Sequence, residues 1–132
     1  MMGDRSPLSV AQQAWDYWVA ADLEGFLSLW DDDGVWTNAG HSKIAGPRRG
    51  HQEIGNVART VFEVSGGTFS ARPRDLVAVG DDSVLGFFHM TAERDGMTLD
   101  QSALQRMVVR DGKIVSLDNM FSDEAAMDAF FA

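Results

Sequence analysis

Residues 69–121 of this 132-residue chain alternate between strand-forming runs and short turn signals. Asp95-Gly96 and Asp111-Gly112 each stand between two such runs. An Asp-Gly pair in that position is typical of a two-residue hairpin turn, because glycine takes the positive φ that the turn requires. The sequence therefore predicts three long antiparallel strands in series, and we expect the curved sheet that they form to be one wall of a pocket.

Helical patterns occur mainly before this stretch. Apolar residues recur at helical spacing after Ser9, the expected N-cap, and a second helix is expected to begin at Asp22. Residues 31–33 are consecutive acids whose side chains point in different directions, so we predict a solvated turn that ends the second helix rather than a cation site. The remaining elements are expected to be a strand over 35–38, a helix over 51–64, a strand over 68–79 bent at Pro73, and a helix over 123–131. Helices followed by a run of strands predict an α+β fold.

Length and composition limit the class of protein. With 45% apolar and 23% charged residues, 132 residues are typical of one globular domain, so we expect a single domain over 1–132. The lack of cysteine excludes disulfides and thiolate chemistry. A net charge of −9 argues against nucleic acid or anionic membrane as a partner. No apolar run approaches the roughly 18 residues of a membrane span, and no signal-peptide pattern begins the chain, so we expect a cytoplasmic protein.

Several short segments are informative through their order and spacing along the chain. They are 22–36, 39–46 with Arg49-Gly50, 66–69, 92–96, 110–114 and 123–131. Together they resemble the SnoaL-like, ketosteroid-isomerase-like branch of the nuclear-transport-factor-2-like superfamily over nearly the whole chain. The resemblance implies a cone-shaped α+β barrel, with three helices from the N-terminal half packed on a curved, mixed, mostly antiparallel sheet and a short C-terminal helix. It also implies a conical pocket and, often, a homodimer formed through the outer face of the sheet.

Known activities in this family include ketosteroid isomerisation, polyketide ring closure, epoxide hydrolysis and dehydration, so the fold alone does not determine the reaction. The resemblance places the isomerase general base on Asn38 and the acid of its oxyanion hole on Gln105. The tyrosine of that hole falls near positions 13–14, which are Gln and Ala. One acid of limonene epoxide hydrolase falls on Asn119, and its other charged residues fall around 86–88 and are missing. Because an amide cannot take a proton, we expect neither mechanism.

If Gln105 faces the pocket, as the resemblance implies, strand alternation predicts which other side chains face it. The expected inward set is Trp36, Asn38, Gly86, Phe88, Met90, Ala92, Gln101, Ala103, Gln105, Met107, Val109, Leu117, Asn119 and Phe121. The predicted ligand contacts are Trp18, Trp36, Phe62, Phe88, Met90, Met107, Leu117 and Phe121. Such an apolar lining with three amides is typical of a small-molecule site. The alternative is a filled core in which the amides bond to one another or to the backbone.

Two further residues are candidates for proton transfer. His41 follows the first strand near the expected pocket mouth, and the alternative is a solvated loop histidine. Asp118 alternates outward, and only a one-residue bulge would bring it inside in place of Asn119. Phe87 and His89 are expected on the outer face, where an exposed aromatic favours a dimer interface.

Two functions fit these observations. The first is a cofactor-independent isomerase, cyclase or dehydratase for an apolar, polyketide- or terpenoid-like substrate. In it, Asn38, Gln105 and Asn119 would bond to a developing oxyanion, and His41 or Asp118 would move protons. The second is a non-catalytic, dimeric binding protein for a hydrophobic small molecule. Neither a cofactor nor a metal is expected, because the three histidines are scattered without ligand spacing.

Overall fold

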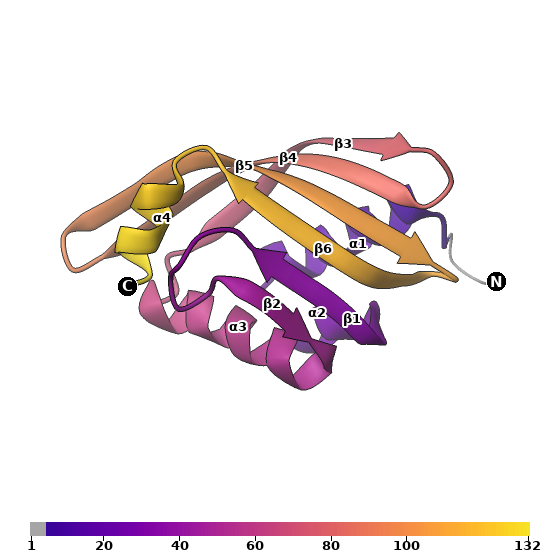
Figure 1. Ribbon diagram of the computed structural model, residues 1–132, viewed down its shortest axis with the longest axis horizontal. Coiled ribbons are helices and arrows are strands. Elements are labelled where there is room, and N and C mark those ends of the chain that lie inside the picture. Colours follow the sequence, from indigo (N-terminus) through magenta and orange to yellow (C-terminus); the bar gives the residue numbers. More distant parts are fainter. Residues whose placement is uncertain (1–4) are drawn as a thin grey trace.

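A six-stranded sheet carries the fold in the computed structural model, which describes residues 5–132 (Figure 1). The elements are α1 (Pro7–Val19), α2 (Leu23–Ser28), β1 (Trp30–Asn38), β2 (Gly46–Arg49), α3 (Gly50–Val64), β3 (Ser70–Val79), β4 (Ser83–Arg94), β5 (Met97–Arg110), β6 (Lys113–Phe121) and α4 (Glu124–Phe130). The strand order is β2-β1-β6-β5-β4-β3, with β1 and β6 parallel and every other pair antiparallel. The predicted α+β class with a mixed, mostly antiparallel sheet is confirmed.

Both Asp-Gly pairs form the predicted hairpin turns. Asp95 and Gly96 link β4 to β5 with φ values of 48° and 81°, and Asp111 and Gly112 link β5 to β6 with 51° and 74°. Positive φ at both central residues is the mark of a type I′ turn, whose twist matches that of the strands. The turns therefore bring β4, β5 and β6 side by side.

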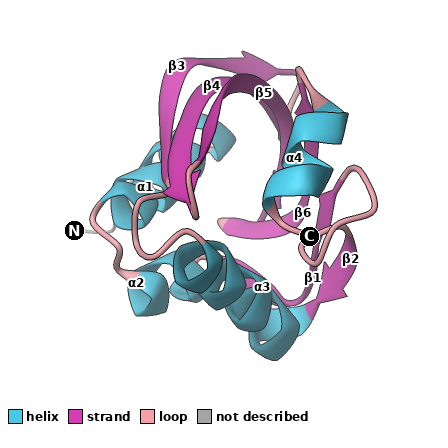
Figure 2. Cartoon of the chain, turned by 90° about the vertical axis from the view of Figure 1, so that its left-hand side faces the viewer, coloured by secondary structure: helices cyan, strands magenta, loops and turns pink. Residues whose placement is uncertain are grey.

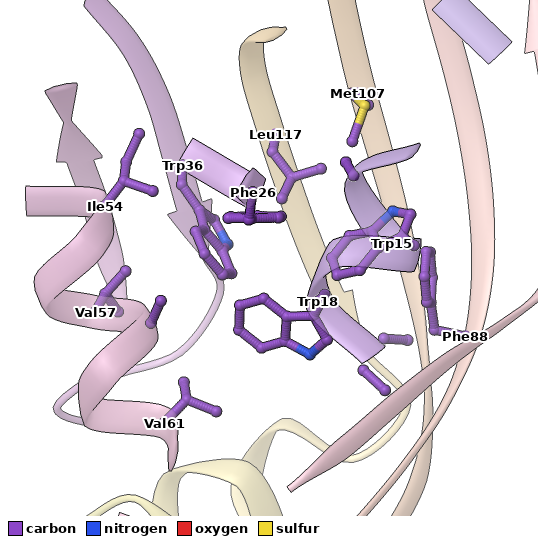
Figure 3. Close-up of a cluster of buried hydrophobic side chains, with 14 of the residues drawn as sticks. Trp15, Trp18, Phe26, Trp36, Ile54, Val57, Val61, Phe88, Met107 and Leu117 are labelled. Atoms are coloured by element: carbon purple, nitrogen blue, oxygen red, sulfur yellow. The ribbon is translucent and has the colours of Figure 1, made fainter. Parts of the chain in front are cut away.

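Helices close the concave side of the sheet. In Figure 2 the sheet curls so that β3, β4 and β5 arch over one side, while α1 and α3 lie across the opposite side. Helix α1 packs against β3 and β4, and α3 packs against β1. Between these layers lies the core, where Trp15, Trp18 and Phe26 meet edge to face or tilted (Figure 3). Burying each such ring stabilises the fold by about 1.5–3 kcal/mol relative to exposure.

Helix α1 begins earlier than its sequence pattern indicated. The N-cap is Ser6 rather than Ser9, because the Ser9 backbone N–H donates to Ser6 Oγ at 3.3 Å. Pro7 occupies the first helical position, where its fixed φ and missing N–H cost nothing. Asp22 caps α2 as predicted, accepting from the Gly25 N–H at 2.9 Å.

The prediction that residues 31–34 form a turn ending the second helix was wrong. Helix α2 ends at Ser28, and β1 already begins at Trp30, which pairs with Ile114. The pairing then shifts, and Val35 pairs with Ser116, so the acids between them bulge out of the ladder. Burial of the Trp30 ring favours this solution, because it draws the strand start into the core while the acids stay in water.

Strand β3 lies at one edge of the sheet. The register of β3 against β4 shifts between Pro73 and Asp75, as expected for a proline that cannot donate to the ladder. Within residues 5–132, no helix is long and apolar enough to cross a membrane.

Candidate functional site

A small cavity, called here the inner cavity, lies between the helices and the concave face of the sheet. Its free volume is about 30 Å³. Its lining comes from three helices, five strands and two connecting segments, and consists of Trp15, Trp18, Trp36, Asn38, Ile44, Val61, Phe69, Ala71, Met90, Gln105, Asn119, Phe121 and Met127. Figure 3 shows Trp18 between α3 and the sheet, near Trp15 and Trp36, whose rings lie 5.8 and 5.6 Å away.

Strand alternation puts the predicted inward side chains of β4 and β5 on the buried face of the sheet. Along β5 the inward residues Gln101, Ala103, Gln105 and Met107 are buried, while Arg106 between them is exposed. The same alternation holds on β4, where Phe88 and Met90 are buried.

Three amides form a polar row across the sheet. Asn38 pairs with Asn119 between β1 and β6, and Asn119 pairs with Gln105 between β6 and β5. Asn38 Oδ1 accepts from Trp36 Nε1 at 3.0 Å and from Asn119 Nδ2 at 2.7 Å. Asn38 Nδ2 donates to the Ile44 carbonyl oxygen at 3.0 Å. The row is therefore anchored at its Asn38 end.

The cavity also holds polar atoms that the rest of the described chain does not satisfy. Gln105 Oε1, Asn119 Oδ1 and Trp18 Nε1 are buried without a hydrogen-bond partner among residues 5–132. A buried polar atom that has lost its water and gained no partner costs about 1–3 kcal/mol of stability. These three atoms are available to hydrogen-bond with a molecule in the cavity.

A larger depression, called here the outer groove, adjoins the inner cavity. Its volume is about 560 Å³, and it shares Trp18, Phe69 and Ala71 with the inner cavity. The remaining lining residues are Val19, Ala21, Phe62, Gly67, Thr68, Ser70 and Arg72. Trp18 and Phe69, whose ring centroids lie 6.2 Å apart in an edge-on arrangement, therefore line both spaces.

The predicted ligand contacts fall into three groups. Trp18, Trp36, Met90 and Phe121 line the inner cavity, and Phe62 lines the outer groove. The remaining three, Phe88, Met107 and Leu117, are buried in the core outside both linings. Phe88 packs on Trp15 with ring centroids 4.7 Å apart, so its inward side chain is used for packing.

Two residues proposed for proton transfer lie away from the cavity. The His41 side chain is 90% exposed, and its Nδ1 lies 3.6 Å from Asp128 Oδ2. Asp128 also accepts the His41 backbone N–H at 2.8 Å, which holds the loop against α4 rather than over the cavity. Asp118 is exposed opposite Arg106, and the β5–β6 register has no shift at that point. The bulge that Asp118 needed to face inward is absent from this strand pair, so Asn119 occupies the inward position.

One group of side chains could hold a metal ion. His41, Glu124 and Asp128 offer ligand atoms within 4.8 Å of one another. His41 and Glu124 are exposed and Asp128 is half-buried, and acidic groups often gather at a protein surface without an ion. The group lies outside the lining of the inner cavity.

Sequence reasoning missed several lining residues. The helical spacing of apolar residues could have identified Trp15 and Val61, since each lies on the apolar face of its helix. Ile44 comes from the irregular segment between β1 and β2, and its carbonyl is used by Asn38, which no periodicity reveals. Phe69 precedes an edge strand, and Met127 lies on the short C-terminal helix.

The chemistry available in the inner cavity is neutral. Among the described residues, its lining contains rings, aliphatic groups and amides but no carboxylate, histidine, lysine, arginine or tyrosine. Side-chain proton transfer at neutral pH requires such a group, so this lining can bind and orient a molecule but has no general acid or base.

Comparison with known proteins identifies relatives of the whole chain. The family model described as "SnoaL-like domain" matches residues 11–117. The uncharacterized protein Rv0034 of Mycobacterium tuberculosis (strain ATCC 25618 / H37Rv) is 24% identical over 131 residues, covering 99% of this chain and 100% of its own length.

Solved structures share the fold. Bal32a, from a soil-derived mobile gene cassette, has a TM-score of 0.92 at 24% identity, covering 98% of this chain and 100% of its own. TerC, co-crystallized with polyporic acid, has a TM-score of 0.83 at 23% identity, covering 95% of this chain and 97% of its own. RV0760c of Mycobacterium tuberculosis, in complex with estradiol-17beta-hemisuccinate, has a TM-score of 0.74 at 21% identity, covering 86% of this chain and 92% of its own. Further neighbours are described as NTF2-like proteins of Burkholderia species.

Proposed function

Because the chain belongs to the SnoaL-like domain family, we propose that it binds an uncharged, mostly apolar small molecule at the inner cavity and the outer groove. This is the second of the two functions that fit the sequence. The observation that carries the proposal is the composition of the inner cavity's lining, which combines aromatic rings with three amides and has no ionisable side chain among the described residues. An apolar site with a few placed polar groups is suited to a neutral ligand, whereas a buried charge without a partner is strongly disfavoured.

The two volumes indicate how a ligand would be seated. The inner cavity, at about 30 Å³, has room for a group about the size of one water molecule. The outer groove, at about 560 Å³, has room for a ring system. The body of the ligand would lie in the groove against Phe62 and Phe69, and its tip would pass Trp18 into the inner cavity.

Two structural neighbours support the proposal. TerC was co-crystallized with polyporic acid, and RV0760c was solved in complex with estradiol-17beta-hemisuccinate. Both proteins share the fold of this chain. They show that this fold holds organic molecules in other proteins, and we extend that role to the present cavity.

A cofactor-independent isomerase, cyclase or dehydratase is the second candidate. The observation that favours it is the unpartnered indole N–H of Trp18, a donor that could stabilise negative charge on a substrate oxygen. Its weakness is that His41 and Asp118, the residues proposed to move protons, lie outside the cavity. Binding is therefore the function that the geometry supports better.

We further propose that the protein is a homodimer formed through the outer face of the sheet. Phe87 pairs with Leu104, and Leu104 pairs with Met120, so the three form one outward row across β4, β5 and β6. Phe87 is 46% exposed and Met120 is 57% exposed. Apolar side chains gathered on one sheet face are typical of an interaction surface.

Nuclear magnetic resonance tests the binding proposal. In the ¹⁵N-labelled full chain, each of the four tryptophans gives an indole N–H signal. Titration with 2-naphthol should shift the signals of Trp18 and Trp36, which line the inner cavity, while Trp30, which does not, serves as the internal control.

The charged analogue 2-naphthoate is the matched ligand control. It has the same ring but carries a carboxylate, so it should leave the Trp36 signal in place. The proposal is wrong if 2-naphthol moves neither Trp18 nor Trp36, or if 2-naphthoate moves Trp36 as strongly. Substitutions Trp18→Phe and Trp36→Phe assign the signals.

A further inference from the structure

The indole N–H of Trp36 determines the orientation of the amide beside it. Trp36 Nε1 lies 3.0 Å from Asn38 Oδ1, and an indole nitrogen can only donate. The Asn38 atom facing Trp36 must therefore be its oxygen, and its nitrogen donates to the Ile44 carbonyl. The choice between amide oxygen and nitrogen thus follows from hydrogen-bond chemistry.

Asn38 in turn orients Asn119. Asn38 Oδ1 accepts from Asn119 Nδ2 at 2.7 Å, so the nitrogen of Asn119 is committed. The oxygen of Asn119 then has no partner in the described part of the chain. Gln105 lies directly opposite on the neighbouring strand, and its buried oxygen is equally unpartnered within residues 5–132. Two acceptors therefore stand side by side on one wall.

These acceptors are costly for a core that serves only packing. Gln105 is 6% exposed and Asn119 is 7% exposed, so water outside the protein does not solvate them. A buried acceptor that has lost water without gaining a bond destabilises the fold. An apolar residue of similar size at position 105 would avoid that cost, which points to a ligand as the reason for the oxygen.

The donors and acceptors of the cavity match one chemical group. The indole N–H of Trp18 is an unpartnered donor in the same lining as the two unpartnered oxygens. A hydroxyl group both donates and accepts, so it complements this set. A carbonyl oxygen, by contrast, could accept from Trp18 but would leave both oxygens without a donor. The volume of about 30 Å³ suits a single small polar group.

We infer that the inner cavity binds a hydroxyl group of the ligand, which donates to the oxygen of Gln105 and accepts from the indole N–H of Trp18. This inference rests on the proposed binding function and adds the class of ligand: an alcohol or phenol rather than a ketone or ether. The hydroxyl of a ligand and a water molecule share this chemistry, so the test must separate them.

Isothermal titration calorimetry with two matched probes makes the separation. 2-Naphthol carries the hydroxyl, and 2-methoxynaphthalene keeps the ring and the oxygen but lacks the proton. The ether is the more apolar probe, so burial alone would favour it. We expect the wild-type chain to bind 2-naphthol about tenfold more tightly, the effect of roughly one hydrogen bond.

A pair of glutamine variants locates the effect. Gln105→Met removes one acceptor at similar volume and should reduce the preference to about threefold or less. Gln101→Met is the control on the same strand and face, because both Gln101 polar atoms bond to the Asp123 backbone. That variant should retain the tenfold preference. Should Gln105→Met fail to fold by circular dichroism, Gln105→Leu makes the same change.

The outcomes separate this inference from the proposed function. If both probes bind equally while the Trp18 signal shifts, binding stands and the hydroxyl inference is wrong. The inference also fails if Gln105→Met and Gln105→Leu keep the full preference, since groups other than Gln105 would then recognise the hydroxyl. If neither probe binds, the proposed function and the inference fall together.

Discussion

At the scale of single residues, hydrogen bonding distinguishes two buried glutamines that the sequence treats alike. Gln101 and Gln105 lie on the same face of β5 and are both buried. Gln101 Nε2 donates to the Asp123 carbonyl and its Oε1 accepts from the Asp123 N–H, both at 3.1 Å, which ties β5 to the start of α4. Gln105 has an oxygen that the described chain leaves unsatisfied. Two identical residues therefore carry different roles, one structural and one available to a ligand.

The two glutamines should respond oppositely to substitution. Gln105→Met removes an unsatisfied acceptor, so the free energy of unfolding should stay constant or rise by up to about 1 kcal/mol. Gln101→Met leaves the Asp123 backbone groups without partners, so stability should fall by about 1–3 kcal/mol. Urea unfolding followed by tryptophan fluorescence measures both values. An equal loss in the two variants would show that Gln105 is satisfied in solution by protein groups.

Residue roles were predictable where a regular strand carries the side chain. Asn38, Gln105 and Asn119 were placed inward by alternation in the register that the family resemblance implies, and all three line the inner cavity. The position of His41 was not predictable, because it depends on the loop contact with Asp128, 87 residues away. The packing of Phe88 against Trp15 was likewise hidden, since alternation indicates a face but not whether that face is filled.

At the scale of elements, the two hairpins hold the sheet in register. Each is a two-residue turn with positive φ at both positions. A slip of one residue in β5 would turn Gln105 away from the cavity, because side chains alternate between faces. The turns therefore support the site as well as the fold.

Gly96→Ala tests the contribution of the first hairpin. Gly96 has φ of 81° and no atom within 4 Å of an added Cβ, so the cost is backbone strain alone. Stability should fall by roughly 1 kcal/mol, measured as a lower urea midpoint. Thr98→Ala, an exposed change on the next strand, is the control, and its free energy of unfolding should fall by only a few tenths of a kcal/mol. A Gly96→Ala variant as stable as the wild type would contradict the assigned turn.

Element order was largely readable from the sequence, whereas element ends were not. Asp-Gly pairs and alternation predicted β4, β5 and β6, and Asp22 correctly marked the start of α2. The start of β1 was missed because three acids interrupt it, and only the burial of Trp30 explains why the strand begins before them. Tertiary packing, which local patterns do not contain, sets such boundaries.

At the scale of the whole molecule, the sheet has two faces with different uses. Helices cover the concave face, as Figure 2 shows. The inner cavity lies between them and the sheet. The outer face carries the row of Phe87, Leu104 and Met120 across three strands. One face would bind a ligand and the other a second copy of the chain.

The proposed dimer predicts a mass of twice 14.5 kDa in solution. Phe87→Arg places a charge in the outer row, where burial without a partner is unfavourable, and should give the monomer mass in light scattering after size exclusion. Gln12→Arg adds the same charge at an exposed position of α1 and should leave the dimer intact. A wild-type chain that runs as a monomer, or a Phe87→Arg variant that stays dimeric, would refute the proposed interface.

Methionine methyl groups report directly on whether a small molecule enters the inner cavity. Met90 and Met127 line the cavity, whereas Met120 lies exposed on the outer face. With methionine methyls labelled with ¹³C, nuclear Overhauser contacts from bound 2-naphthol can be observed at each position. We predict contacts to Met90 and Met127 and none to Met120. Contacts to Met120 without any to Met90 or Met127 would place the ligand outside the cavity and contradict the account.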